Sequence, residues 1–483
     1  METTKKPVII LEDSLGKVEI PADAYYGINT YRAVHNFPIT HYKLHPKLII
    51  AFALVKKAAA YANEVTLEVK APGTYQHIIS ACDQIIAGAF HDQFVVDPIQ
   101  GGAGTSINMN ANEVIANIAL EEMGYEKHRY DIISPYDHIN MSQSTNDVNP
   151  TAARLCVRRL LDDLLETMHE LAKIFQAKAD EFDSVVKMGR THLQDAIPIR
   201  LGQTFDAYTR VLRRDIERIS KIGNHLYQVN LGATAVGTAL NANAIYVKKA
   251  IDKLREVTGF EKLALYESLV DGTQNTDAFT EVSGALKISA LNMSKIANDL
   301  RLMASGPRCG FAEISLKPLQ PGSSIMPGKV NPILPELINQ VAFQVCGNDL
   351  TVSMASEAGQ FELNVMQPVL VYNLIQSVSM MNNAYKVFGE HCVKEITLSA
   401  YNLERIKSYV DNSPILATGL SPAIGYKRAE AYAKIAIRDN KTVYEVCAAD
   451  EALVNELGGI EKLKQLLDAD AMTRWGERMR DTL

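Results

Sequence analysis

The sequence lacks the features that mark secreted, membrane-spanning and nucleic-acid-binding proteins. Its 483 residues include six cysteines, which are widely spaced and form no CxxC pair, so a disulfide framework is not expected. No segment approaches the roughly eighteen apolar residues of a membrane helix, and the apolar run 8–11 is too short for a signal peptide. The formal charge of −7 provides no general attraction to nucleic acid or anionic membranes. We therefore expect a cytoplasmic protein with reduced thiols.

Two common kinds of catalytic site are missing as well. The chain has no G-x-S-x-G motif of a serine nucleophile, and its eleven histidines include no HExxH or H-x-H pair. His41 and His45 lie in HYKLHP without a nearby carboxylate. These absences predict a site that works by acid–base chemistry and holds no metal.

The apolar residues predict a mainly α fold. Over 161–175 and 282–303 they recur three and four positions apart, as one face of a helix requires. Residues 199–306 contain no proline, so long helices are permitted there. Helices longer than the usual globular length indicate a bundle whose apolar faces are shared between subunits. The best strand candidates are short segments near residues 6–19 and around Val95.

The pattern divides the chain into three parts. Residues 1–145 are expected to form a mixed, mostly helical N-terminal domain, and residues 146–400 a central bundle of long helices. Residues 401–483 are expected to form a small helical C-terminal domain. No internal repeat or low-complexity segment interrupts this organisation.

Four segments rich in glycine or hydroxyl groups interrupt the helical pattern. The first, GGAGTSINMNANEV, covers residues 101–114. Its glycine-rich turn exposes backbone N–H groups, and with the hydroxyls of Thr105 and Ser106 it suits an anion at the start of a helix. It lacks the Gly-Lys-Ser/Thr ending of a nucleotide-binding loop. A tight turn in which Thr105 caps a helix explains the segment equally well.

The second segment, NMSQSTNDVNPTAARL, covers residues 140–155 and leads into a long helical pattern that Pro150 is expected to begin. An N-cap accounts for one polar side chain at such a position. Four in succession exceed what one cap needs: Ser144, Thr145, Asn146 and Asp147.

The third segment, MGRTHLQDA, contains Thr191 and His192. A single histidine is more often a structural group than a catalytic one, and it becomes a candidate only with a partner carboxylate.

The fourth segment, PGSSIMPGKVNP, covers residues 321–332 and can be neither helix nor strand. Lys329 and Asn331 can bind a carboxylate by charge and by amide N–H. Ser323 and Ser324 lie on a glycine-flanked stretch that could close over a substrate. A serine acts as a base only if N–H groups, a lysine and the exclusion of water stabilise its alkoxide. An ordinary surface loop is the competing interpretation.

Together these four segments resemble the signature sequences of the aspartase/fumarase superfamily. GSSIMPGKVNP is the superfamily's highly specific signature, and GGAGTSINMN, SQSTND and GRTHLQDA follow its order and spacing. The likeness extends over nearly the whole chain. It implies a mainly α, three-part fold whose long-helix bundle is shared across a homotetramer. Each active site would be built from segments of three subunits.

The resemblance also implies roles for individual residues in an elimination from a small dicarboxylate. Ser323 matches the catalytic base, and Glu336 matches the residue that orients His192. The substrate's β-carboxylate and its aci-carboxylate (enediolate) form would be bound by Thr105, Ser144, Thr145 and Ser324. The α-carboxylate would be held by Lys329, Asn331 and Thr191, and the amino group would face Asn146 and His192.

Within the superfamily the chain resembles the branch that eliminates ammonia from L-aspartate to give fumarate. It reads AGTSIN and SQSTND where class II fumarases usually carry SGTQTN and SQSSND, and NPILPELINQ follows the signature where they have NPTQCEALTM. Fumarate hydratase acting on L-malate is the alternative, and a crystallin-like structural protein is the rival of another class. The implied reaction needs no cofactor, with activation by Mg²⁺ left open, and no nucleic-acid or membrane partner is expected.

Overall fold

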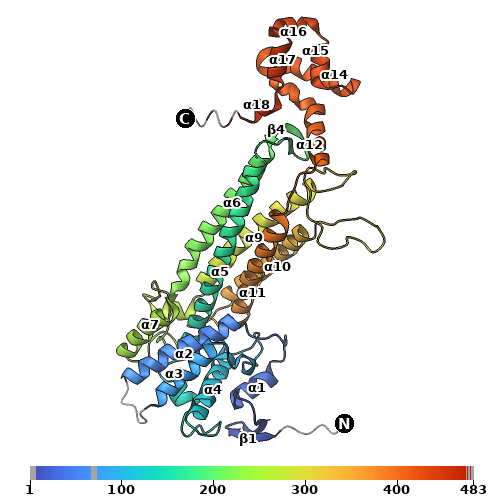
Figure 1. Cartoon of the computed structure of the whole chain (residues 1–483). Coiled ribbons are helices and arrows are strands. Elements are labelled where there is room, and N and C mark those ends of the chain that lie inside the picture. Colours follow the sequence, from blue (N-terminus) through green and yellow to red (C-terminus); the bar gives the residue numbers. More distant parts are fainter. Residues whose placement is uncertain (1–6, 67–72, 475, 477–478, 480–483) are drawn as a thin grey trace. The chain divides into compact units, whose positions relative to one another are not determined.

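The computed structural model describes residues 7–66, 73–474, 476 and 479, and its fold is mainly α, as predicted. Five long helices run through it (Figure 1): α5 (Thr145–Glu181), α6 (Leu201–Gly223), α9 (Asp277–Met303), α10 (Ile333–Glu357) and α11 (Gln367–Phe388). The chain forms two compact units, unit 1 (residues 1–166, 217–288 and 343–382) and unit 2 (the remainder), and each long helix passes from one unit into the other. No helix in the described part of the chain combines the length and apolar character needed to cross a bilayer.

Unit 1 contains the N-terminal half of α5 and several shorter elements. Its helices are α1 (Ile28–Asn36), α2 (Pro46–Thr66), α3 (Thr74–Ile86), α4 (Thr105–Glu122), α7 (Ala244–Thr258) and α8 (Leu269–Gln274), with short turns η1 (His91–Gln93), η2 (Pro135–Ile139) and η3 (Asn224–Tyr227). Its strands form two two-stranded sheets, an antiparallel one of β1 (Val8–Asp13) and β2 (Gly16–Pro21) and a parallel one of β5 (Gln228–Val229) and β6 (Ala264–Leu265).

The strands predicted near residues 6–19 are confirmed from residue 8 on, while Lys6 lies outside the described residues. The strand predicted around Val95 is wrong. Val95 lies in irregular backbone, and its N–H donates to the Asn110 side-chain oxygen at 3.1 Å instead of to a neighbouring strand.

Unit 2 contains an antiparallel hairpin and the C-terminal helices. The hairpin consists of β3 (Val186–Thr191) and β4 (Gln194–Arg200). The C-terminal elements are η4 (Gly389–Val393), α12 (Ala400–Asn412), η5 (Pro414–Leu420), α13 (Ser421–Ile424), α14 (Tyr426–Asp439), α15 (Val443–Ala448), α16 (Glu451–Leu457), α17 (Ile460–Leu466) and α18 (Ala469–Thr473). From η5 onward they pack around their own apolar core, which includes the fully buried Leu420, Cys447 and Leu463.

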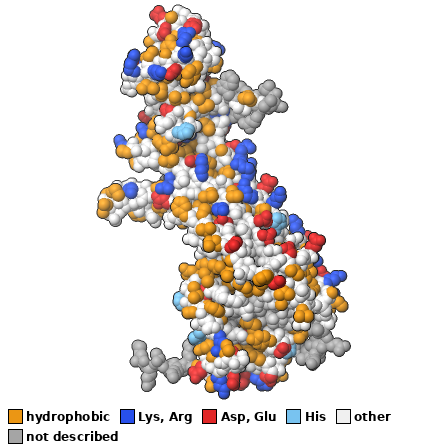
Figure 2. Space-filling view, turned by 180° about the vertical axis from the view of Figure 1, so that it is seen from behind, with side chains coloured by type: hydrophobic (Ala, Val, Ile, Leu, Met, Phe, Trp, Pro, Cys, Tyr) orange, Lys and Arg blue, Asp and Glu red, His pale blue; other side chains and the backbone are white. Residues whose placement is uncertain are grey.

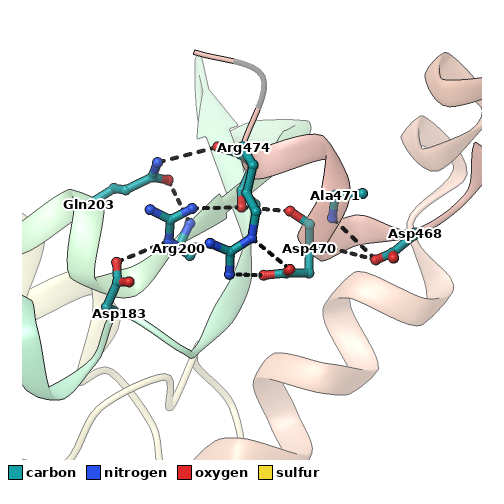
Figure 3. A network of polar contacts seen from close by, with 8 residues as sticks. Asp183, Arg200, Gln203, Asp468, Asp470, Ala471 and Arg474 are labelled. Carbon is teal, nitrogen blue, oxygen red and sulfur yellow. Dashed lines mark hydrogen bonds and ion pairs between the residues drawn. The ribbon is translucent and has the colours of Figure 1, made fainter. Parts of the chain in front are cut away.

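A polar network holds α18 to the end of the hairpin (Figure 3). Arg200, the last residue of β4, donates through Nε to Asp183 at 3.0 Å and through Nη1 to the Thr473 hydroxyl at 3.1 Å. Gln203 Nε2 reaches the Thr473 carbonyl at 3.4 Å. Arg200 is only 4 % exposed, and charged groups that are desolvated and paired in this way are expensive to leave unpaired. The network therefore fixes where α18 lies against β4.

The helix predicted after residue 151 is α5, and its apolar positions form one buried face. Leu161, Leu164, Met168, Leu171 and Phe175 are all at most 1 % exposed, and each buried side chain of this size stabilises the fold by about 2 kcal/mol. The helix begins at Thr145 rather than at Pro150, which lies inside its second turn. Proline lacks the N–H that would donate to the Asn146 carbonyl, and this carbonyl accepts Asn230 Nδ2 at 3.1 Å instead.

Helix α10 is apolar on two faces. Ala342, Val345 and Val352 are buried. On another face Phe343, Leu350 and Met354 are 68, 63 and 64 % exposed, with the helical spacing of seven and four residues. Hydrophobic side chains also occupy broad areas of the surface seen in Figure 2. A helix that is apolar on both sides is typical of one that is covered on both sides.

Candidate active site

The predicted site residues form two groups, one in each unit. Thr105, Ser144, Thr145 and Asn146 lie in unit 1, while Thr191, His192, Ser323, Ser324, Lys329, Asn331 and Glu336 lie in unit 2.

In unit 1 the glycine-rich turn 101–104 lies directly against the start of α5. Asn149 Nδ2, in the second turn of α5, donates to the Ala103 carbonyl at 3.3 Å. Gly104 has φ +93°, and a Cβ there would come within 2.6 Å of the Asn149 side chain. Asn108 Nδ2, on α4, donates to the Thr145 hydroxyl at 3.2 Å. The structure thus brings together two of the four segments that the sequence singled out.

Thr105 is not the cap of α4. Gly104 occupies the cap position, and Thr105 is the first helical residue. Its hydroxyl donates to the Gly102 carbonyl at 2.7 Å, and the residue is exposed. The Thr105 N–H also donates to the Gly102 carbonyl, at 2.9 Å, and the Ile107 N–H donates to Gln100 Oε1 at 3.1 Å. An anion at this helix start would therefore have to draw the Thr105 hydroxyl away from Gly102, aided by the positive partial charge of the helix start.

Asp147 organises the polar segment at the start of α5. One carboxylate oxygen accepts the Ser144 N–H at 3.0 Å, and the other accepts the N–H groups of Gly232 and Thr234, both at 3.0 Å. Asp147 is fully buried, and burial raises its pKa to about 6 although these N–H bonds act in the opposite direction. The fourth polar residue of the segment is therefore structural.

The sequence reasoning missed a fifth segment, residues 230–238, which reads NLGATAVGT. Asn230 Nδ2 donates to the Asn146 carbonyl at 3.1 Å, and Asn146 Nδ2 donates to the Ala235 carbonyl at 2.8 Å. The segment therefore lies beside Asn146 and fixes its side chain. The sequence does carry a sign of this segment, because its glycines and threonines interrupt a stretch that is otherwise free of proline and helical in pattern.

Lys56, in the middle of α2, is a second missed residue. It is 1 % exposed, and its Nζ lies 3.0 Å from the side-chain oxygens of Asn140 and Gln143. Burial lowers the pKa of Lys56 to about 7, and the charge of Asp147 acts against this. Through these two contacts the lysine holds residues Asn140 and Gln143 of the 140–147 segment in place. Nothing in the run FALVKKAAA distinguishes it from a surface lysine.

In unit 2 the hairpin presents Thr191 and His192 at its tip. Thr191 pairs with Gln194, which leaves His192 and Leu193 as a two-residue turn. Their φ angles are +55° and +59°, the left-handed values of a type I′ hairpin turn. Thr191 and His192 are both exposed. Sequence reasoning found these two residues but not the hairpin that positions them.

The loop 321–332 is closed by its own backbone. The Gly322 N–H donates to the Lys329 carbonyl at 3.0 Å, and Asn331 Nδ2 donates to the Gly322 carbonyl at 2.7 Å. Inside this closure the Ser323 hydroxyl oxygen accepts the N–H groups of Ile325 and Met326, at 3.2 and 3.0 Å. The loop surrounds a hollow of about 480 Å³ that Ser323 and Lys329 both line.

Glu336 lies in the first turn of α10 and is partly exposed. In the part of the chain that the structure describes, no hydrogen bond joins Glu336 to His192. Their pairing therefore stays a prediction. The described residues include no group of three or more His, Cys, Asp or Glu that could hold a metal ion.

The two groups differ in chemistry. The unit 1 group offers hydroxyls and helix starts, which suit a carboxylate. The unit 2 group offers a serine whose oxygen already receives two N–H bonds, together with an exposed lysine and an exposed imidazole. Proton abstraction beside a carboxylate needs both kinds of group, because the base must be paired with donors that hold the developing negative charge.

Known proteins resemble this chain over nearly its whole length. Residues 16–347 match a family model described as Lyase, and residues 416–474 match one described as Fumarase C C-terminus. The chain is 55 % identical to the aspartate ammonia-lyase of Bacillus subtilis, over 98 % of this chain and 97 % of that protein. It is 48 % identical to the Escherichia coli aspartate ammonia-lyase, over 90 and 91 % of the two chains.

Two solved structures resemble this one over nearly their full length. A fumarate lyase:delta crystallin from Brucella melitensis, bound to cobalt, has a TM-score of 0.92 at 46 % identity and covers 97 % of this chain and 100 % of its own. A class II fumarase from Schistosoma mansoni has a TM-score of 0.91 at 32 % identity, with 97 and 99 % of the two chains covered.

Proposed function

Because the chain belongs to the aspartase/fumarase superfamily of lyases, we propose that it is an aspartate ammonia-lyase, which reversibly eliminates ammonia from L-aspartate to give fumarate. The identities of 45–56 % to proteins of that name support this reading. The likeness to a class II fumarase is weaker, at 32 %. Hydration of fumarate to L-malate is therefore the second candidate.

The observation that carries the proposed chemistry is the environment of Ser323. A free serine is far too weakly acidic to act as a base at neutral pH, so its alkoxide needs stabilisation. Two backbone N–H groups already point at the Ser323 oxygen, and Lys329 lines the same hollow. Both features favour the charged form of the serine.

The elimination begins with removal of a proton from the β-carbon by Ser323. The electron pair left on carbon moves into the neighbouring β-carboxylate and gives an aci-carboxylate with two negative charges. Thr105, Ser144, Thr145 and Ser324 are the proposed donors to this group, and loss of one such donor typically raises the barrier by about 3 kcal/mol. Collapse of the intermediate expels the amine and leaves fumarate.

The remaining groups hold the other end of the substrate. Lys329, Asn331 and Thr191 are proposed to bind the α-carboxylate, with Asn146 and His192 beside the amine and Glu336 orienting His192. An amine that leaves as neutral ammonia needs no general acid, so His192 serves here to bind and orient the amine.

A homotetramer with active sites shared by three subunits is part of the proposal. The exposed apolar face of α10 supports it, since Phe343, Leu350 and Met354 need a partner surface. A second copy of the chain is the partner proposed. The wide separation of the four segments in sequence fits sites assembled from several chains.

The proposed reaction uses only groups of the chain and a small dicarboxylate substrate, with no resident cofactor. Treatment with a chelator should leave the rate unchanged, and a loss that Mg²⁺ restores would show activation by the metal. A cytoplasmic location is also proposed, and it is supported by the six free thiols, four of them buried in the cores of the two units.

The test of the proposed function is formation of fumarate, followed by its ultraviolet absorbance, with L-aspartate and L-malate supplied separately. A rise with aspartate alone supports the ammonia-lyase. A rise with malate alone would make the chain a fumarate hydratase with the same base and carboxylate-binding groups. No rise with either, from folded protein, would favour a structural role.

A further inference from the structure

The turn that carries His192 is held in a conformation that its own residues disfavour. Type I′ turns have positive φ at both central positions and are usually made of Asn-Gly. Here His192 and Leu193 occupy them at +55° and +59°, which costs roughly 1 kcal/mol or more for each non-glycine residue. The turn is therefore imposed by the strands on either side.

The strands alone are a weak support. A two-stranded hairpin is at best marginally stable without packing, and the register of this one shifts between Met188 and Arg190. Behind it lies a hollow of about 600 Å³ that Thr191, Ile197, Tyr208, Asp299 and Met472 line. The tip is thus not packed from behind. On the β4 side Asp195 Oδ2 accepts the Ser413 hydroxyl at 2.8 Å, and a further contact must fix β3.

A buried ion cluster provides that contact. The Glu313 side chain is fully buried, and its Oε1 lies 2.8 Å from Arg190 Nη1. Its Oε2 lies 3.1 Å from Lys187 Nζ, in an ion pair without hydrogen-bond alignment. Both cations belong to β3, and Arg190 is two residues from His192. A charged hydrogen bond of this kind is strong because water is excluded around it.

Glu313 is itself fixed by the backbone of unit 2. Its N–H donates to the Met303 carbonyl at 2.8 Å, and the preceding carbonyl, of Ala312, accepts Asn402 Nδ2 at 2.8 Å. Aromatic rings hold the guanidinium as well, since Arg190 lies 4.2 Å from the centre of the Phe311 ring and 5.5 Å from that of Tyr409. Arg190 is therefore clamped on several sides.

We propose that Arg190, through Glu313, is the positioning residue of the His192 turn: it sets where Thr191 and His192 stand without touching substrate. Lys187 is the secondary partner, which keeps Glu313 neutralised. The role rests on the proposed elimination, in which a misplacement of about 1 Å can lower the rate about a hundredfold.

The first test is independent of activity. Hydrogen exchange of the full-length protein, followed by mass spectrometry, compares the wild type with Arg190→Met. Glu313 keeps Lys187 as a partner in this variant, so the fold is expected to persist. Exchange should quicken at least tenfold in peptides covering 189–197 and stay unchanged in the β1–β2 hairpin. Unchanged exchange at 189–197 would overturn the proposal.

The second test is a double-mutant cycle on turnover of L-aspartate. Arg190→Met should lower kcat by about 10- to 100-fold in the wild type. In a Thr191→Ala/His192→Ala background it should lower kcat less than threefold, because both groups that it positions are already gone. Equal losses in both backgrounds would reveal a merely structural effect and overturn the proposal.

Two further variants serve as comparisons. Lys295→Met removes another cation that lines the same hollow but belongs to α9, and it should leave kcat unchanged. Arg190→Lys retains the charge without the planar fork and should recover part of the lost rate. Absence of fumarate from the wild type would reject the proposed function, while the exchange result would still decide the role of Arg190.

Discussion

At the scale of single residues, Ser323 and Lys329 share one loop but differ in what surrounds their reactive atoms. The serine oxygen receives two backbone N–H groups, whereas the lysine side chain is exposed. A substitution of the serine therefore tests chemistry, and a substitution of the lysine tests binding.

Ser323→Ala should lower kcat for L-aspartate by about a thousandfold, because loss of a general base typically removes two to four orders of magnitude. The rate of fumarate formation measures this, with Ser408→Ala, an exposed serine of α12, as the control of unchanged rate. Near-normal turnover in Ser323→Ala would remove this serine as the base.

Lys329→Ala should raise KM for L-aspartate by about a hundredfold, since hydrogen bonds to charged groups contribute about 1.5–3 kcal/mol. Lys317→Ala, which removes a surface lysine paired with Glu395, should leave KM unchanged. If the two variants had equal KM values, Lys329 would not be part of the carboxylate clamp.

His128 should make unit 1 sensitive to acid. Burial, aided by Lys127, lowers its pKa from 6.5 to about 4. The unfolded chain takes up the proton first as the pH falls, so the stability present above pH 6.5 is lost between pH 6.5 and 4, by up to about 3 kcal/mol. Asparagine tolerates the φ of +66° at this position. Between pH 7.5 and pH 5 the melting temperature of His128→Asn should therefore fall by less than that of the wild type. Parallel losses in both proteins would assign the acid sensitivity elsewhere.

At the scale of elements, the long helices could be predicted from the sequence and the hairpin could not. The apolar face of α5 could be predicted because its leucines recur three and four residues apart. The structure buries these side chains together on one face of the helix. The β3–β4 hairpin has His and Leu where a turn signal would be Asn-Gly, and its strands depend on the distant Glu313. Val95 was misread because a β-branched residue indicates a strand only when a neighbouring strand exists to pair with it.

The closure of the loop 321–332 depends on one glycine. A Cβ on Gly322 would lie 2.3 Å from the Lys329 carbonyl oxygen and 3.2 Å from the Asn331 nitrogen. Gly322→Ala should therefore open the loop base and lower kcat/KM at least tenfold. The melting temperature should stay within a few degrees, because the loop is exposed. Normal kcat/KM would show that the closure is not needed for turnover.

At the scale of the whole molecule, one chain brings together part of the candidate site, and the proposed tetramer would supply the rest. The four segments and their residues were found from the sequence, and the structure joins two of them at the start of α5. Which chains contribute to one site cannot be read from a linear sequence, since symmetry decides it. The three-part division of the chain and the roles of the site residues likewise stay predictions.

Leu350→Glu should break the proposed assembly. A charge on the exposed apolar face of α10 would have to be desolvated in the subunit contact, which costs several kcal/mol. Size-exclusion chromatography with light scattering should show smaller species, and activity should fall with them. Ile437→Glu, at an equally exposed position of α14 (66 %), is the matched control. A tetramer with full activity in Leu350→Glu would contradict the proposed contact.

The two apolar faces of α10 also have a consequence for how the protein comes into being. A newly made chain that has folded alone still displays Phe343, Leu350 and Met354 to water, and such a surface binds like surfaces indiscriminately. Productive pairing is second order in chain concentration, so it slows steeply on dilution, whereas capture by unrelated sticky surfaces does not. The yield of active protein would thus depend on whether a new chain meets another copy before it meets an unrelated apolar surface. That yield would be highest where many copies are synthesised close together.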